Sequence, residues 1–171
     1  MKMEVSYLLL DKLKEFEGLR LEAYRCPGGV LTIGYGHTGS DVREGDRISQ
    51  YWAEELLKAD VAKVAEQVER LGVALTQGQF DALVSFAFNI GVERLRTSKL
   101  LRLIRRQDSY RNIKAEFKRW VYAGGRKQPG LERRRVWEAS RFFEQSLSPD
   151  PSPVREGRVK GMKSEKMKNE K

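Results

Sequence analysis

A short segment of this chain places a carboxylic acid, a thiol and a hydroxyl group close together. Cys26 follows Glu17 after eight intervening residues, and Thr32 follows Cys26 after five. Carboxyl, thiol and hydroxyl groups are among the side chains that transfer protons or act as nucleophiles in enzymes. We therefore interpret residues 17–38 as part of a catalytic cleft.

Each of these three residues also has an ordinary structural explanation. A lone Glu at a helix end is usually a solvated charge, and a single Cys is usually a small buried hydrophobe. Thr in a strand is usually present for its β-propensity. Catalysis is favoured only because the three residues occur together, at this spacing and in this local context.

The elements expected around the segment are a helix and a hairpin. Apolar residues recur at helical spacing over residues 5–16, so Glu17 falls at the end of a helix that Gly18 terminates. The runs 23–26 and 30–33 flank a Pro-Gly-Gly turn, which is typical of a β-hairpin. Glycines at 34, 36 and 39 remove side chains that would block a long substrate, and they favour an open groove over a closed pocket.

This segment resembles the phage-type lysozymes of glycoside hydrolase family 24. Their pattern is a Glu at a helix end, eight residues, an Asp or sometimes Cys, five residues and then Thr. The matching residues here are Glu17, Cys26 and Thr32. The resemblance continues in residues 75–91 and again between 117 and 135, so that it covers residues 5 to 146 in order.

The resemblance implies a fold and an activity. The fold is α+β and mostly helical: a two-lobe lysozyme fold with a small β-hairpin lobe, a long connecting helix and a helical C-terminal lobe. The activity is hydrolysis of the β-1,4 bond between N-acetylmuramic acid and N-acetylglucosamine in peptidoglycan. Such an enzyme is an endolysin, the bacteriolytic protein of a phage or prophage.

The resemblance also implies a role for each site residue. Glu17 would protonate the glycosidic oxygen, and Thr32 would hold or orient the attacking water. Cys26 stands where most relatives have Asp, which could act as base for that water or shield positive charge on the sugar. A free thiol has a pKa of about 8.5 and is mostly neutral at pH 7, so the missing carboxylate leaves the stereochemistry open, with inversion through water preferred.

Two other functions stay open on the sequence alone. A lytic transglycosylase needs only one Glu and releases an anhydro sugar, so the absence of a second carboxylate permits it. A non-catalytic module that binds cell wall or DNA could keep the fold without the chemistry. Glu17 and Thr32 argue against such a module, since both are retained.

The single histidine, His37, has no Cys or His partner at metal-ligand spacing, so we expect neither a metal nor a cofactor. The resemblance implies that His37 pairs with Asp60 on the following helix.

Helical periodicity continues along the rest of the chain. A long helix over residues 50–71 is expected to connect two lobes. Thr76 with Gln79 predicts a capping box at the start of a buried central helix. Further helices are expected over 95–106, 111–123 and 130–145. Three prolines and many lysines after Ser148 predict a disordered basic tail over 148–171, which leaves residues 1–147 as the lysozyme domain.

The formal net charge of +9 favours an anionic polymer as partner, either nucleic acid or the bacterial envelope. Arg133, Arg134 and Arg135 could contact nucleic acid, but the resemblance places an Arg pair at 134–135 near the acid, where it would support Glu17 or grip the glycan. Peptidoglycan is therefore the expected partner, and nucleic acid is not.

The first ten residues hold too short an apolar run for a signal peptide, and no segment is apolar enough for a membrane anchor. The one cysteine fits a reducing compartment. We expect a monomer that stays in the host cytoplasm until a separate membrane-permeabilising protein releases it to the wall.

Overall fold

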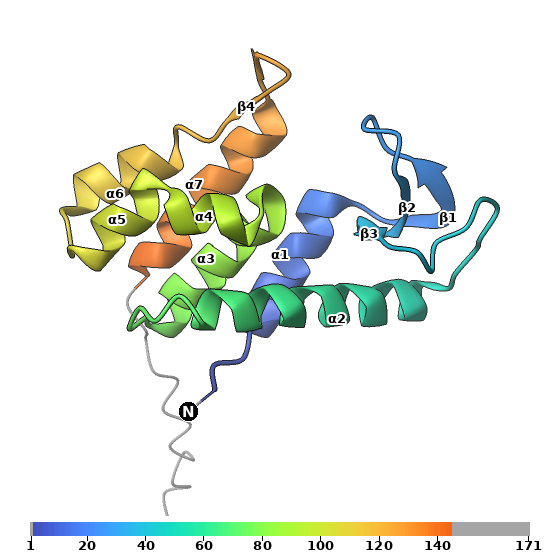
Figure 1. Cartoon of the computed structure of the whole chain (residues 1–171), viewed down its shortest axis with the longest axis horizontal. Helices are drawn as coiled ribbons and strands as arrows, with labels where there is room; N and C mark the ends of the chain where they lie inside the picture. The colour runs from blue at the N-terminus through green and yellow to red at the C-terminus, as the bar shows by residue number, and fades with distance from the viewer. Residues whose placement is uncertain (1, 145–171) are drawn as a thin grey trace, which may run out of the picture.

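The computed structural model describes residues 2–144. A small sheet lies at one end of the molecule and a body of helices at the other, as Figure 1 shows. Two helices, α1 (Tyr7–Glu17) and α2 (Gln50–Glu69), run from the helical body to the sheet. This arrangement confirms the predicted α+β class with a small β lobe, a long connecting helix and a helical C-terminal lobe.

Helix α1 delivers Glu17 to the junction of the two lobes. Ser6 caps its start by accepting a hydrogen bond from the Leu9 amide at 3.1 Å. Leu9 and Leu13 are fully buried and hold the helix against the body. Glu17 is the last helical residue, as predicted, because Gly18 takes a positive φ of 72°. The helix begins two residues later than residue 5 because the cap lies at Ser6.

The sheet holds one more strand than the predicted hairpin. Strands β1 (Arg20–Arg25) and β2 (Leu31–Gly34) are antiparallel, and β3 (His37–Thr38) pairs with the other edge of β2. The chain reverses between β2 and β3 at residues 34–36, where Gly34 and Gly36 have φ values of 65° and 83°. The sequence predicted only two strands here, because a two-residue strand such as β3 is too short to show an alternating pattern.

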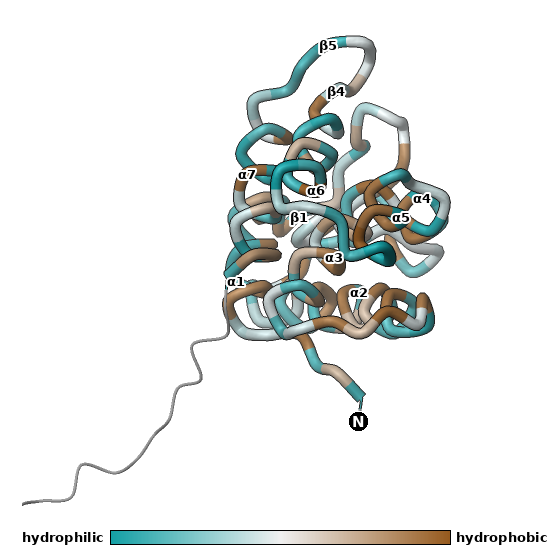
Figure 2. The backbone as a smooth tube through the Cα atoms, turned by 90° about the vertical axis from the view of Figure 1, so that its left-hand side faces the viewer, coloured by the Kyte–Doolittle hydropathy of each residue, from teal (hydrophilic) through white to brown (hydrophobic). Residues whose placement is uncertain are grey.

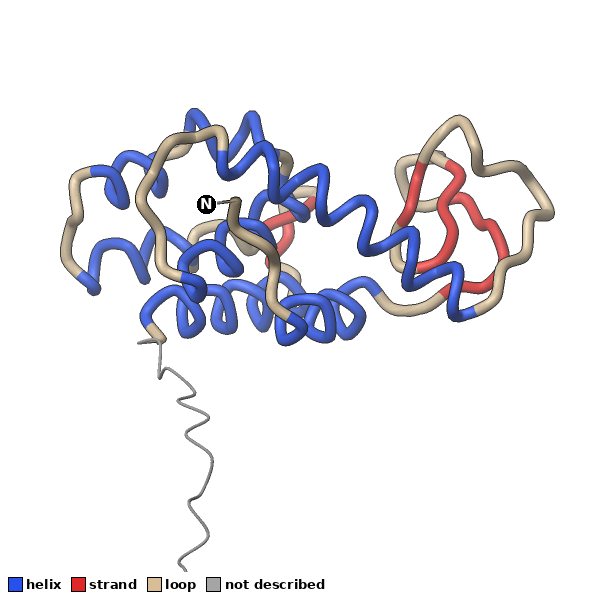
Figure 3. Tube along the Cα trace, turned by 90° about the horizontal axis from the view of Figure 1, so that it is seen from below, coloured by secondary structure: helices blue, strands red, loops and turns tan. Residues whose placement is uncertain are grey.

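The sheet is seated on α2. A Cβ atom added at Gly34 would lie 3.3 Å from the Cβ atom of Ala53, so the backbone of β2 approaches the helix closely. Figure 3 shows α2 running as one continuous helix from the helical body to the strands. In Figure 2 hydrophobic and hydrophilic stretches alternate along α2, as they do on a helix with one buried face.

Helix α3 (Gln77–Ile90) is the centre of the helical lobe. The predicted capping box is present, with Thr76 Oγ1 accepting from the Gln79 amide and Gln79 Oε1 accepting from the Thr76 amide. Most of its side chains are buried, and α7 (Pro129–Phe143) packs along it. This packing places the polar residues of α7 close to the end of α1.

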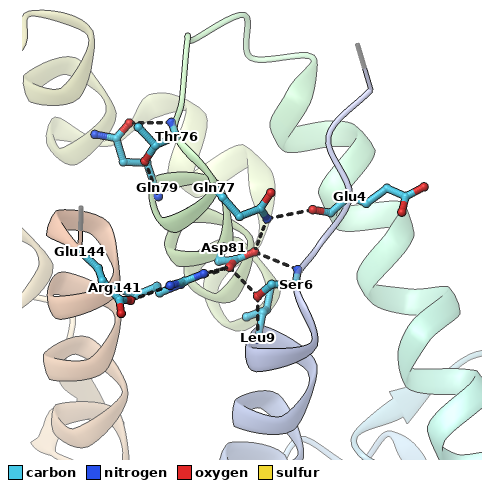
Figure 4. A network of polar contacts seen from close by, with 9 residues as sticks. All are labelled: Glu4, Ser6, Leu9, Thr76, Gln77, Gln79, Asp81, Arg141 and Glu144. Carbon is cyan, nitrogen blue, oxygen red and sulfur yellow. Dashed lines mark hydrogen bonds and ion pairs between the residues drawn. The ribbon is translucent and has the colours of Figure 1, made fainter. Parts of the chain in front are cut away.

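A buried carboxylate ties α1, α3 and α7 together (Figure 4). Asp81 on α3 is fully buried and accepts hydrogen bonds from Ser6 Oγ at 2.6 Å, Arg141 Nη2 at 2.7 Å and Gln77 Nε2 at 2.9 Å. The start of α1 is thereby fixed relative to α7.

Two predicted helices are corrected by the structure. The span 95–106 is broken into α4 (Val92–Thr97) and α5 (Lys99–Arg105), since Ser98 takes extended backbone and caps α5 by accepting from the Leu101 amide at 3.0 Å. The span 111–123 is helical only in α6 (Tyr110–Phe117). Strands β4 (Tyr122–Ala123) and β5 (Arg126–Lys127) follow as a hairpin, because Gly124 and Gly125 have positive φ values and make the turn.

The last predicted helix, 130–145, ends two residues earlier than expected: α7 stops at Phe143, and Glu144 takes extended backbone as its C-cap. The predicted division into 1–147 and 148–171 falls outside the described residues. Across residues 2–144, none of the helices has the length and apolar character needed to cross a membrane. The same residues contain no group of His, Cys, Asp or Glu side chains arranged to hold a metal ion.

Candidate functional site

Glu17 lies between the helical body and the sheet. Its Oε1 atom accepts a hydrogen bond of 2.6 Å from Arg134 Nη1 on α7. Its Oε2 atom faces the turn between β2 and β3, where a Cβ atom at Gly36 would lie 3.4 Å away. The side chain is 23 % exposed, so one carboxylate is held from both sides and still reaches solvent.

Two open cavities meet at Glu17. The larger, of about 590 Å³, lies between α1, the β4–β5 hairpin and α7, and its lining includes Lys12, Phe16, Gln128, Arg133 and Trp137. The smaller, of about 410 Å³, lies between the β2–β3 turn, α2 and α3, and its lining includes Gly36, Thr38, Asp60, Lys63 and Phe88. Glu17 and Asn89 line both cavities. A long ligand could therefore pass the Glu17 carboxyl, as the predicted groove requires.

Arg134 is buried beneath Glu17 and nearly all of its hydrogen-bonding groups are engaged. Besides Glu17, its Nη2 atom donates to the Ser85 carbonyl at 2.9 Å and its Nε atom donates to Glu138 Oε1 at 3.3 Å. The guanidinium group also lies over the Phe16 ring, 5.1 Å from the ring centroid. These contacts restrain Arg134 on every side, so its bond to Glu17 has a defined direction.

Cys26 directly follows β1 and is half-buried. Hydrogen bonds from the backbone amides of Val30 and Gly28, and a further one from the Thr32 hydroxyl, lower the pKa of the Cys26 thiol. Relative to a free thiol, the hairpin turn therefore shifts Cys26 toward the negatively charged thiolate.

Thr32 on β2 is buried beside Cys26. Its single hydroxyl proton can be donated either to the Val30 carbonyl oxygen, 3.1 Å away, or to the Cys26 sulfur. Thr32 pairs across the sheet with Tyr24 and Thr38. The fold thus brings Cys26 and Thr32 together.

Glu17 is placed apart from these two residues. It precedes the end of the ladder where Arg20 pairs with Gly34, whereas Cys26 follows the opposite end, where Arg25 pairs with Leu31. Within residues 2–144 no hydrogen bond joins Glu17 to Cys26 or Thr32, and neither of the two lines the cavities at Glu17.

The predicted support of Glu17 by the arginine pair is confirmed for Arg134 and wrong for Arg135. Arg135 is fully buried and donates instead to Glu138, to Asn89 Oδ1 and to the Trp120 carbonyl. Sequence reasoning missed Glu138 and Asn89. The spacing of Glu138, four residues after Arg134 and three after Arg135 on one helix, is the signal that could have found it.

The predicted pairing of His37 is confirmed. His37 Nδ1 lies 2.6 Å from Asp60 Oδ2, and Nε2 lies 3.1 Å from Asp41 Oδ2. Burial lowers the pKa of His37, but the hydrogen bonds to Asp60 and Asp41 outweigh burial and raise it overall. His37 thus links β3 to α2 through charge.

Comparison with known proteins places this geometry in a family. A family model described as Phage lysozyme matches residues 14–138. The chain is 41 % identical over 144 residues to the endolysin of Bacillus phage B103, covering 82 % of this chain and 54 % of that protein. It is also 41 % identical over 145 residues to the endolysin of Acyrthosiphon pisum secondary endosymbiont phage 1, covering 82 % of this chain and 98 % of the relative.

A solved structure shows the same fold. The muramidase domain of SpmX from Asticaccaulis excentricus superposes with a TM-score of 0.76 at 37 % identity, covering 83 % of this chain and 99 % of that domain. The chain spans about half the length of the Bacillus phage endolysin, so its similarity to that protein concerns one part of it.

Proposed function

Since the chain belongs to the phage lysozyme family, we propose that it is an endolysin: a glycoside hydrolase that cleaves the β-1,4 bond between N-acetylmuramic acid and N-acetylglucosamine in bacterial peptidoglycan. The observation that carries the proposal is the position of Glu17 at the meeting point of two open cavities, held by Arg134. A glycan chain laid along these cavities would present a glycosidic oxygen to this carboxyl group.

Glu17 is the general acid of the proposed reaction. It would donate its proton to the oxygen of the leaving sugar as the bond breaks, since sugar alkoxides are poor leaving groups without protonation. Partial exposure lets the carboxyl reach substrate, while its hydrogen bond to Arg134 fixes the direction in which it points.

Thr32 and Cys26 are assigned to the water side of the reaction. The Thr32 hydroxyl would orient the attacking water, and the Cys26 thiolate would supply the negative charge that Asp supplies in most relatives. The lowered pKa of Cys26 supports that assignment. We prefer an inverting outcome, in which water attacks the sugar directly and no covalent bond between sugar and enzyme forms.

The test compares Glu17→Gln with the native chain on purified peptidoglycan, followed by wall turbidity and by mass spectrometry of the products. Loss of lysis with retained fold is expected, because the amide matches the carboxyl in size and cannot deliver a proton. Glu22→Gln is the control, since Glu22 is an exposed carboxylate on β1 paired with Arg47. Retention of more than a few per cent of activity by Glu17→Gln would refute the assignment, and anhydro products would indicate a transglycosylase.

Delivery belongs to the same proposal. The enzyme acts on the cell wall as a monomer, resides in the host cytoplasm before lysis, and reaches the wall after a separate protein has permeabilised the membrane. Fractionation of cells that express the chain alone, before and after chemical permeabilisation, checks the residence, and size-exclusion chromatography with light scattering checks the monomer.

A further inference from the structure

A buried carboxylate stands directly behind the arginine that holds Glu17. Glu138 on α7 is fully buried, and its Oε1 atom accepts from Ser85 Oγ at 2.7 Å and from Arg134 Nε at 3.3 Å. Its Oε2 atom accepts from Arg135 Nη1. One carboxylate is therefore bonded to two guanidinium groups, and one of these groups is bonded to Glu17.

We propose that Glu138 is a positioning residue that sets how readily Glu17 holds its proton, acting through Arg134. The inference rests on the proposed role of Glu17 as the acid. Arg134 donates to Glu17 with one nitrogen and to Glu138 with another, so it joins the two carboxyl groups through a single buried cation.

The physical reason is the balance of charge. Arg134 and Arg135 bring two positive charges into a region almost without solvent, and Glu138 supplies one negative charge against them. Burial raises the pKa of Glu138 overall, and the guanidinium groups of Arg135 and Arg134 counter only part of that rise. We nevertheless take the carboxylate as ionised, because each of its oxygens accepts a hydrogen bond from a guanidinium group.

Removal of that negative charge would leave the second positive charge without a partner. A net positive field beside Glu17 favours its ionised form, which cannot act as an acid. Glu138 thus keeps Arg134 in place as a hydrogen-bond donor while cancelling part of its field.

Other charged groups around Glu17 are nearer to solvent. In the two cavities these groups are Lys12, Glu15, Arg133, Asp60 and Lys63. Lys12 pairs with Glu15 at 2.6 Å and Lys63 pairs with Asp60 at 3.2 Å, so these four charges offset one another at a surface where water screens them. Arg133 lies in the exposed part of α7. Glu138 and Arg135, in contrast, are fully buried.

The decisive variant is Glu138→Gln, which removes the charge and keeps the size. We expect the titration midpoint of the Glu17 carboxyl, followed by carbon-13 NMR of the labelled side chain, to fall by about one pH unit. The rate in neutral solution should fall about tenfold, while the rate at acidic pH is retained.

Asp81→Asn is the matched control. Asp81 is also a fully buried carboxylate that joins α3 to an arginine of α7, at 2.7 Å from Arg141 Nη2 (Figure 4). In the described part of the chain no hydrogen bond joins Asp81 to Arg134. The Asp81→Asn variant should therefore lower stability and leave the Glu17 midpoint and the pH profile of activity unchanged.

A second pair of variants covers the case in which Glu138→Gln does not fold. Arg135→Gln removes one positive charge, so that Glu138 is paired with Arg134 only, and it should raise the titration midpoint of Glu17. The double variant Arg135→Gln with Glu138→Gln restores the charge balance and should return the midpoint to the native value. The same midpoint in both of these variants would overturn the proposal, as would an unmoved midpoint in folded Glu138→Gln or an equal movement in Asp81→Asn.

The NMR readout requires no catalysis, which separates this inference from the proposed function. A midpoint that moves as expected, combined with an active Glu17→Gln variant, would refute the role of Glu17 and leave the coupling to Glu138 standing. An unmoved midpoint with an inactive Glu17→Gln variant would refute the coupling alone.

Discussion

At the scale of single residues, the fold prepares Glu17 and Cys26 by different means. Glu17 is held by a charged side chain from a distant helix, Arg134, and is free to meet a ligand in either cavity. Cys26 is held by backbone amides of its own turn. The first arrangement depends on tertiary packing and the second on a local loop, so the two residues should respond differently to mutation and to pH.

The lowered pKa of Cys26 predicts that its thiol reacts with alkylating reagents at a lower pH than a free thiol does. The rate of alkylation by iodoacetamide should rise with pH and level off below the pH at which a free thiol does, because the thiolate is the reacting species. If Cys26 takes the place of the second catalytic residue, alkylation should inhibit lysis, peptidoglycan should protect the thiol, and Cys26→Asp should stay active. An unreactive thiol together with an inactive Cys26→Asp would show that Cys26 has a packing role.

Gly36 is the residue whose missing side chain makes room for Glu17. Gly36→Ala would place a methyl group 3.4 Å from Glu17 Oε2 at a φ of 83°, so we expect a loss of about 1 kcal/mol in unfolding free energy and a fall in activity that exceeds the loss of folded protein. Urea unfolding and turbidity assays measure the two effects.

Gly45→Ala is the control for Gly36. Its φ is 84°, and an added Cβ atom would meet no atom of residues 2–144 within 4 Å. It should lose similar stability without loss of activity per folded molecule. Equal activity losses in both variants would mean that backbone strain alone explains Gly36.

At the scale of elements, charged pairs set how strands and helices meet. His37 and Asp60 join β3 to α2, and Asp41 in the loop after β3 bonds the other ring nitrogen. These contacts link the small sheet to the connecting helix, in addition to the close approach of Gly34 and Ala53.

The raised pKa of His37 predicts a stability that depends on pH. Its contribution is fully present below the pKa of unfolded histidine and is lost as pH rises through the raised folded value. Asp41, whose pKa is lowered by its hydrogen bond to His37, contributes above the pKa of unfolded aspartate and loses that contribution as pH falls through its lowered value. The contacts therefore act together in mildly acidic to neutral solution.

Asp60→Asn tests this dependence. We expect it to lower the unfolding free energy by about 1 kcal/mol near pH 6 and by much less near pH 9, with catalysis retained. Urea titrations at both pH values measure the difference. A loss of the same size at both would contradict a contribution from charge.

At the scale of the whole molecule, the basic character of the chain extends past the described residues. Residues 149–171 hold seven Lys or Arg and four Asp or Glu, and supply +3 of the net charge of +9. Their composition, with three prolines and no aromatic residue, predicts no apolar surface to bury.

Removal of residues 149–171 should therefore leave the melting temperature within about one degree of the native value. Differential scanning calorimetry of the shortened chain checks this expectation. A fall of several degrees would mean that the segment packs against the domain, and the domain boundary at residue 147 would then have to move.

The sequence by itself determined the elements whose signals are local. Glu17 at a helix end, the Pro-Gly-Gly turn beside Cys26 and the Thr76–Gln79 capping box depend on residues within a few positions of one another, and the structure has all three. The break at Ser98 was not predicted, because helical periodicity continues across it. The β4–β5 hairpin was not predicted either, because strands of two residues are too short to show an alternating pattern.

Tertiary structure alone decided what surrounds Glu17. Arg134 is 117 positions from Glu17 in the sequence, and Ser85 is 53 positions from Glu138. No local sequence pattern can therefore predict which arginine bonds to Glu17 or which carboxylate bonds to that arginine. The packing of α3 against α7 decides both contacts. The Arg134 side chain is only 3 % exposed, so its guanidinium group must bond to the groups that this packing brings within hydrogen-bonding distance.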